Sequence, residues 1–218
     1  MSQIKEAREP VLDTVERVSE MCFGLFMALT FVGAVSVATA GEAPGHAILD
    51  AALGCNLAWG LADAVIYLIH QITGRSKRLA LALAVQAAPD KGTAIQALRD
   101  ALPPHMKTLV GDEELNAIRA RVAAASLPDR PRFCCDDFLG ALGVFLIVVL
   151  STFPVALPFV LISDIPTALL VSRVLTLAML FAGGFALGRY AGYGGWKAGF
   201  GMVGVGVLLT AAIIALGG

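Results

Sequence analysis

The sequence contains few charged, histidine and cysteine residues, and these shortages argue against several classes of protein. Only 15% of its 218 residues are charged and the net charge is -1, so we expect no nucleic-acid partner. The four cysteines include no CxxC pair, which implies neither a disulfide framework nor a zinc site. We expect no enzyme, because the three histidines are widely separated and no P-loop, dinucleotide-binding glycine motif or zinc-ligand spacing is present.

Hydrophobic residues, in contrast, make up 57% of the chain and gather in five long stretches. These stretches cover 22–40, 47–72, 138–162, 165–187 and 198–216. Each reaches the ~17–25 residues that cross the ~30 Å of bilayer hydrocarbon as a helix. The sequence therefore predicts an all-α, polytopic protein of the lipid bilayer, with five transmembrane helices and a helical insert between helices two and three.

Lys and Arg indicate how these helices are oriented. They occur in the N-terminal segment, in the long linker after helix two and around the turn after helix four, whereas the loops 41–46 and 163–164 contain none. The positive-inside rule then predicts a cytoplasmic N-terminus, a cytoplasmic linker and an external C-terminus. The small size and compact loops suit a bacterial inner membrane. The expected parts are 1–21 (N-terminal segment), 22–72 (helices one and two), 73–133 (linker) and 134–218 (helices three to five).

The linker is expected to be helical in three pieces. The first covers 76–88, the second 93–101, and the third runs from Asp112 to about Ala125, with acidic residues in its first turn. So short a segment, with so few aromatic residues, is not expected to build a core of its own. The first piece either lies on the membrane surface or packs under the bundle.

Polar residues within the apolar stretches are the main candidates for function, because each is costly in hydrocarbon. Asn56 and Asp63 in the second stretch are seven residues apart, so they share a helix face that we expect to point into the bundle. Asp63 is the only acidic residue well within a stretch. It either faces a cavity and binds a cation or proton, or it forms a buried ion pair or hydrogen bonds that fix helix packing.

The entrance to the first helix carries a second group of candidates. Glu16 and Glu20 are one helical turn apart and could present two carboxylates to a divalent cation. In the cation-binding interpretation of Asp63, Glu20, Asn56 and Met27 lie nearby. Glu20 and Asp63 are the candidate metal ligands. The metal is expected as a transported substrate rather than as a resident cofactor.

Pro154 and Pro158 in the third apolar stretch remove two backbone donors and predict a kink or break. The freed carbonyls either line an ion path or are satisfied by neighbouring side chains. Arg173 in the fourth stretch is expected to pair with a polar group at its own depth or to snorkel. Its candidate partners are Asp164, Asp50 and Asn56. Arg189, at the other end of that stretch, is a candidate partner for Asp63.

Together these features resemble the vacuolar iron transporter family. Residues 19–24 (Ser-Glu-Met-Cys-Phe-Gly) are similar to that family's opening of the first span, 153–159 to its third-span proline pair, and 188–201 to its glycine-rich approach to the last span. The resemblance implies five spans with a cytoplasmic helical insert, and transport of a divalent metal, iron or manganese, with proton coupling as an option. It also implies a homodimer formed through the membrane helices, which the glycine-rich surfaces would permit.

The chain departs from the family at several ligand positions. Met27-Ala28 stands where the family has an Asp-Gly pair, and the insert offers Glu113 and Glu114 in place of repeated glutamates and methionines. We therefore expect a divergent relative with a changed substrate or none. The alternatives are a non-transporting membrane scaffold or partner subunit, and a membrane-stress protein whose linker senses the bilayer.

Overall fold

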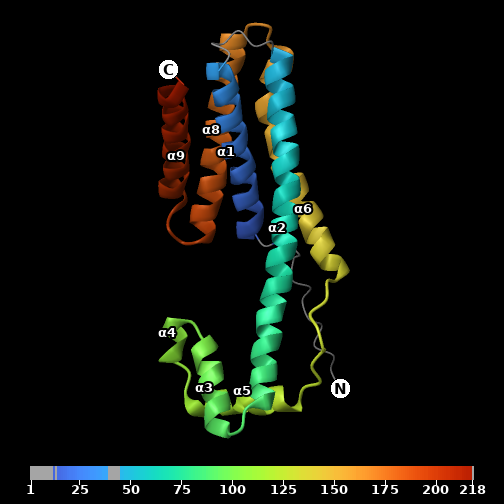
Figure 1. Ribbon diagram of the computed structural model, residues 1–218. Helices are drawn as coiled ribbons and strands as arrows, with labels where there is room; N and C mark the ends of the chain where they lie inside the picture. Colours follow the sequence, from blue (N-terminus) through green and yellow to red (C-terminus); the bar gives the residue numbers. More distant parts are fainter. Residues whose placement is uncertain (1–11, 13, 39–44, 218) are drawn as a thin grey trace, which may run out of the picture. The chain divides into compact units, whose positions relative to one another are not determined.

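The computed structural model describes residues 12, 14–38 and 45–217. Within these ranges the secondary structure is helical, and no strand occurs there. Five helices are long and apolar enough to cross a membrane, which confirms the predicted fold class. They are α1 (Thr14–Ala38), α2 (Gly45–Ala87), α6 (Cys135–Ala156), α8 (Ile165–Tyr190) and α9 (Gly195–Gly217) (Figure 1). Residues 1–11 and most of the loop 41–46, which enter the orientation prediction, lie outside the described residues.

The outward surface of these helices is strongly apolar. Leu61 on α2, Leu150 on α6 and Leu208 on α9 are each more than half exposed, with many similar side chains around them. Exposed apolar area on this scale would favour aggregation in water, whereas in a bilayer it contacts acyl chains. Five apolar helices with this surface fit an integral membrane protein.

Helices α1, α8 and α9 pack closely on one another. Glycines allow the contact between α8 and α9: a Cβ on Gly184 would lie 2.7 Å from the carbonyl oxygen of Ala198, and one on Gly199 would lie 3.1 Å from that of Phe181. The first distance is too short for any side-chain carbon, and the second is barely sufficient for one. Gly184 and Gly199 therefore let helices pack closely within the chain, as small residues do in other membrane bundles.

Two of the spanning helices are longer than the apolar stretches. α1 begins at Thr14, so Glu16 and Glu20 lie on the spanning helix itself. α2 runs without interruption to Ala87, so the separate helix predicted over 76–88 is wrong. Residues 75–87 are mostly Ala, Leu, Lys and Arg, which are strong helix formers, and no proline stops them. At 1.5 Å per residue α2 is about 65 Å long, twice the ~30 Å of hydrocarbon, so it extends beyond the bilayer.

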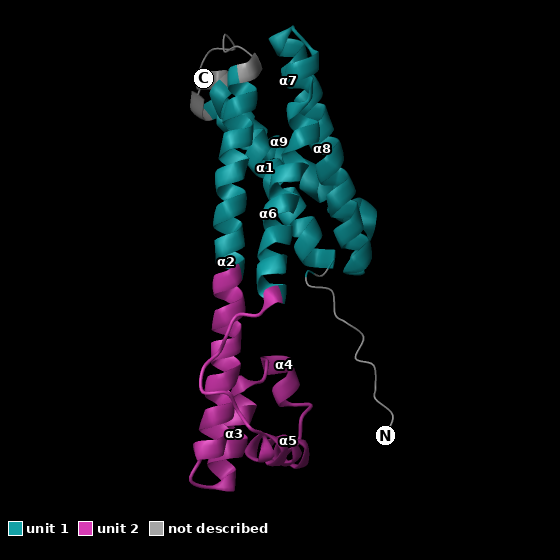
Figure 2. Cartoon of the chain, turned by 90° about the vertical axis from the view of Figure 1, so that its right-hand side faces the viewer, with its two compact units in different colours: residues 1–67, 136–218 teal, residues 68–135 magenta. Residues whose placement is uncertain are grey.

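The chain divides into two compact units, one of residues 1–67 and 136–218, the other of residues 68–135 (Figure 2). The second unit holds the end of α2 and three short helices. These are α3 (Lys91–Ala101), α4 (Pro104–Lys107) and α5 (Asp112–Ala124). The predicted helices over 93–101 and 112–125 are thereby confirmed, while α4 was not predicted.

The second unit also has a small apolar core, contrary to the expectation from its length. Val85 from α2 packs with Ala94 and Leu98 from α3 and with Leu115 from α5. The continuation of α2 supplies one wall of this core, which a linker of separate pieces would lack. A salt bridge of 2.5 Å between Arg99 and Asp112 further joins α3 to α5.

Candidate functional site

Asn56 lies at the centre of the first unit and ties three helices together. Its side chain on α2 is 0% exposed. The Nδ2 group donates to the carbonyl oxygen of Gly24 on α1 at 3.1 Å, and it also donates to the hydroxyl of Thr152 on α6. The predicted inward face of α2 is therefore real at this position. The two α1 and α6 partners were not among the predicted site residues.

Gly24 allows α1 to approach α6 at this level. A Cβ at this position would collide with Ser151 Oγ and would lie 2.8 Å from the carbonyl oxygen of Val148. That carbonyl already accepts hydrogen bonds from the hydroxyls of Ser151 (2.8 Å) and Thr152 (3.3 Å). The three helices thus meet at a small, buried and polar junction. A polar glycine contact of this kind could have been suspected from the Phe23-Gly24 and Ser151-Thr152 pairs in otherwise apolar stretches.

The second polar atom of Asn56 has no partner at this junction. Gly24 O can only accept, so the atom that faces it must be the amide nitrogen, and Oδ1 points elsewhere. Oδ1 is buried and accepts no hydrogen bond within the described part of the chain. An unsatisfied acceptor of this kind costs about 1–3 kcal/mol in a protein interior. A water, a proton donor or a cation at this position would remove that cost.

Asp63 follows on the same face of α2, seven residues and about 10.5 Å along the axis. Its side chain is half-buried, and its Oδ2 is shielded from solvent and accepts no hydrogen bond in the described ranges. Among those residues neither Arg189 nor another Lys or Arg forms an ion pair with it. Within the described residues, therefore, no ion pair or hydrogen bond supports the packing interpretation of Asp63. Further along, Tyr67 packs on Gly140 of α6.

Glu20 on α1 lies close to Asp63. Its half-buried carboxylate is near enough to those of Asp63 and Glu16 for their charges to interact. Glu20 is one turn before Gly24 on α1, while Asp63 is two turns after Asn56 on α2, so the residues that the two predictions considered separately come to the same end of the junction. Like charges in a low-dielectric setting repel, which favours a shared proton or a bound cation.

Arg17, next to Glu16 in the sequence, directs its side chain to a backbone oxygen. Its guanidinium donates two hydrogen bonds to the carbonyl oxygen of Leu12, at 2.8 and 3.0 Å. Met27, the other predicted neighbour, is half-buried on α1, and its carbonyl accepts a 2.9 Å hydrogen bond from Thr30. In the described residues no three His, Cys, Asp or Glu side chains form a group that could hold a metal ion. A metal here would have Glu20 and Asp63 as its carboxylate ligands.

The proline pair breaks the third spanning helix as predicted. α6 ends at Ala156, and a separate turn, α7 (Pro158–Leu161), continues from it. Ser172 of α8 donates a 2.8 Å hydrogen bond to the carbonyl of Val155, between the two prolines. A side chain of α8 thus satisfies a backbone carbonyl next to the break.

The two arginines of α8 do not have the predicted partners. Arg173 is half-buried and forms no ion pair with Asp164 or Asp50 and no hydrogen bond with Asn56. Asp164 does not pair with Arg173 because it caps α8. Its carboxylate accepts hydrogen bonds from the hydroxyl and the backbone N–H of Thr167, at 2.5 and 3.0 Å. These bonds hold the pKa of Asp164 below its usual range. Arg189 is exposed.

No protein-family model matches the chain. No curated protein matches it in sequence.

Proposed function

We propose that the protein moves a cation across the membrane, and that the cation is held in passing by Asn56, Asp63 and Glu20. The observation that carries this proposal is the pair of shielded, unpartnered oxygens, Asn56 Oδ1 and Asp63 Oδ2, on one face of α2. Oxygen acceptors without donors in an apolar bundle are costly for a protein that only needs to pack. A hard cation or a proton gives them a partner.

The identity of the cation follows from the family resemblance rather than from the site. The vacuolar iron transporter family implies ferrous iron or manganese as the cargo, with protons as a possible counter-ion. Two carboxylates and an amide oxygen suit such an ion only if water or backbone carbonyls complete its coordination. Protons alone would also fit a pair of carboxylates that repel one another. In this proposal the N-terminus and the 68–135 unit lie in the cytoplasm of a bacterial cell.

The test is uptake into proteoliposomes that carry the purified full-length protein. Ferrous or manganous ion is supplied outside, with and without a pH gradient, and an internal dye reports protons. Asp63→Asn removes the central carboxylate and should abolish saturable uptake. Asp50→Asn is the matched control, because Asp50 is an exposed aspartate of the same helix and its loss should leave uptake within about twofold, a barrier change below ~0.5 kcal/mol.

Two results would overturn the proposal. One is wild-type protein that moves neither metal ion nor proton while remaining folded. The other is equal loss of uptake in Asp63→Asn and Asp50→Asn, which would assign the effect to overall charge. The first result would favour the second candidate, a non-transporting scaffold, for which the joining of α1, α2 and α6 by Asn56 is the supporting observation.

A homodimer is part of the same proposal. Gly201 and Gly204 on α9 are exposed, and a Cβ on either would meet no described atom within 4 Å. Such a smooth helix face suits close packing against a second copy. Gly204→Ile should therefore lower the mass of the protein–detergent complex in light scattering without lowering its unfolding temperature. A dimer that persists in Gly204→Ile would place the contact elsewhere.

A further inference from the structure

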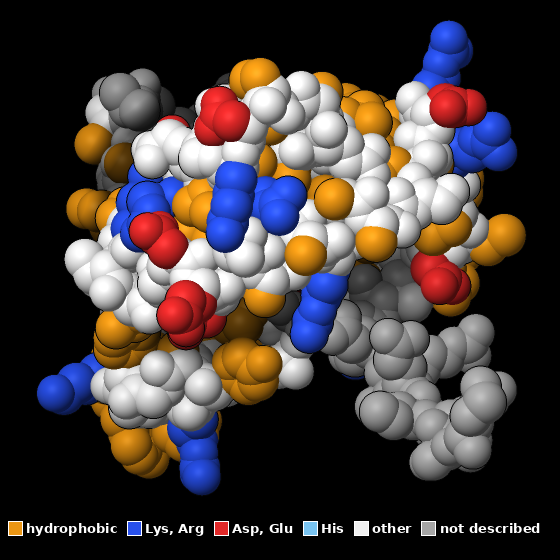
Figure 3. All heavy atoms as spheres, turned by 90° about the horizontal axis from the view of Figure 1, so that it is seen from below, with side chains coloured by type: hydrophobic (Ala, Val, Ile, Leu, Met, Phe, Trp, Pro, Cys, Tyr) orange, Lys and Arg blue, Asp and Glu red, His pale blue; other side chains and the backbone are white. Residues whose placement is uncertain are grey.

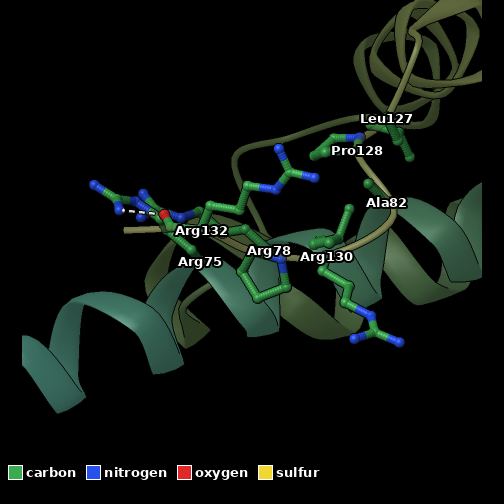
Figure 4. A pocket seen from close by; sticks show the side chains of 9 residues that line it. Arg75, Arg78, Ala82, Leu127, Pro128, Arg130 and Arg132 are labelled. Carbon is green, nitrogen blue, oxygen red and sulfur yellow. Dashed lines mark hydrogen bonds between the residues drawn. The ribbon is translucent and has the colours of Figure 1, made fainter. Parts of the chain in front are cut away.

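The second unit contains a pocket of about 450 Å³ with four arginines in its lining. Arg75 and Arg78 come from α2, and Arg130 and Arg132 from the segment that leads back to α6 (Figure 4). Between them lie apolar side chains. These are Leu79, Ala82, Leu127, Pro128 and Pro131. The pocket therefore combines an apolar floor with a cationic rim, and no acidic side chain of the described residues lines it.

Arg75 closes one side of the pocket. Its guanidinium donates to the carbonyl oxygen of Arg132 at 2.9 Å, drawn as a dashed line in Figure 4, and to Cys134 Sγ at 3.4 Å. These bonds hold the returning segment against α2. The pocket is thus formed by the chain itself before any ligand arrives, which reduces the entropic cost of binding.

The other three arginines carry charge that the described residues do not neutralise. Arg78, Arg130 and Arg132 are exposed, and none of their side chains forms an ion pair or hydrogen bond with a described residue. In Figure 4 the guanidinium groups extend in different directions around the pocket. On the face that Figure 3 shows, Lys and Arg side chains are interspersed with Asp and Glu. An uncompensated cluster of this kind is suited to an anion.

The position of this arginine cluster along the chain indicates which anion it suits. Arg75 is three residues, about 4.5 Å of helix, beyond the end of the apolar stretch at Ile72, and Arg132 is three residues before α6 begins. The Nη2 atom of Arg78 also reaches back to within 3.9 Å of where a Cβ on Gly74 would be. The two segments that line the pocket are therefore continuous in sequence with membrane-spanning helices. Basic clusters directly beside a spanning helix bind anionic lipid headgroups.

We propose that this pocket binds the phosphate of an anionic phospholipid, with Arg78, Arg130 and Arg132 around the headgroup and the apolar floor under its glycerol and upper acyl chain. Guanidinium groups bind phosphate oxygens through paired, charge-assisted hydrogen bonds. A free phosphate ester shares this headgroup chemistry but would leave the apolar floor uncovered, so the lipid fits the whole pocket better. The proposal is independent of cation transport.

The experiment measures lipid retention by the full-length protein with native mass spectrometry. Protein purified in detergent is titrated with phosphatidylglycerol, and separately with phosphatidylcholine. Wild-type protein should retain phosphatidylglycerol in preference to phosphatidylcholine. Arg78→Gln should weaken that retention about fivefold, the effect of one basic residue near an anionic surface. Lys77→Gln is the matched control, since it removes the same charge one residue away but does not line the pocket, and it should have less than about a twofold effect.

Further measurements distinguish a phospholipid from a soluble phosphate as the ligand, and control for misfolding of the variant. Inorganic phosphate and glycerol 3-phosphate at millimolar concentration should not displace the lipid, because they lack the acyl part. If they displace it, the site takes a soluble phosphate and the lipid proposal fails. If Arg78→Gln lowers the unfolding temperature, the exposed Arg130→Gln provides the same comparison. Equal weakening by Lys77→Gln, or equal retention of both lipids, would also overturn the proposal.

Discussion

Replacing Gly24 with alanine tests the junction on which the candidate site is built. The new Cβ would lie 2.8 Å from the carbonyl oxygen of Val148 and 3.2 Å from its Cα, and would collide with Ser151 Oγ. The hydroxyl can rotate away, but the backbone of α6 cannot. α1 and α6 must therefore move apart, and the hydrogen bond from Asn56 to Gly24 O must lengthen.

The magnitude follows from three contributions. Overpacking a close contact costs about 1–3 kcal/mol, and weakening one interhelical hydrogen bond in a membrane protein costs about 0.6 kcal/mol. Alanine returns up to ~1 kcal/mol through its better helix propensity. The net loss is roughly 1–2 kcal/mol, and at about 2–4 °C per kcal/mol for a chain of this length the unfolding temperature should fall by about 2–8 °C.

The assay is thermal unfolding of the full-length protein in detergent, followed by circular dichroism. Gly54→Ala is the matched control, because a Cβ at Gly54 on α2 meets no described atom within 4 Å, and it should melt at or slightly above the wild-type temperature. Adding Ser151→Ala to Gly24→Ala should restore only part of the loss, since the contact with Val148 remains. If Gly24→Ala melted like Gly54→Ala, α1 and α6 would not be in close contact and the junction as described would be wrong.

Three further predictions concern other parts of the chain. Ser172→Ala removes the hydrogen bond to the carbonyl between the prolines and should lower the free energy of unfolding by about 0.6 kcal/mol, measured by the same melts; no change would mean that the bond is not needed there. Leu115→Ala should cost about 2–5 kcal/mol and expose residues 68–135 to proteolysis, because Leu115 is 1% exposed, whereas Leu109→Ala at a 76% exposed site should not. The backbone N–H and hydroxyl of Thr93 hold the pKa of Asp90 below its usual value, so this carboxylate stabilises the fold above its unfolded pKa of ~3.9 and less as pH falls through the lowered value. Asp90→Asn keeps a cap without titrating, so acid titrations of helicity should show a smaller loss between about pH 5 and pH 2, and an unchanged curve would contradict the assignment.

The five spans could be predicted because the length and apolarity of a helix are properties of one segment at a time. The break at Pro154 and Pro158 could be predicted for the same reason, because a proline affects the helix that contains it. The extent of α2 could not be predicted from hydropathy, because residues 75–87 leave the apolar pattern while keeping strong helix formers. The core around Leu115 was missed for the same reason, because one of its walls comes from that extension.

Predicting the site would have required knowing which helices are neighbours. Spacing alone correctly placed Asn56 on an inward face, but only the contact with α1 and α6 shows that both N–H groups of its amide are used. The expected partners of Arg173 failed because Asp164 is committed to a cap, a local requirement stronger than a match in depth.

The unpartnered oxygens separate a functional interpretation of the junction from a structural one. If Asn56 served packing alone, leucine would fill a similar volume without burying an acceptor, and the cost of about 1–3 kcal/mol for Oδ1 would be avoided. Asp63 repeats the pattern two turns away, at the end where Glu20 adds a second carboxylate. One unsatisfied oxygen could be an accident of side-chain placement. Two on the same helix face, beside a repelling carboxylate and with no described arginine or lysine paired to them, are what the proposed path for a cation would explain.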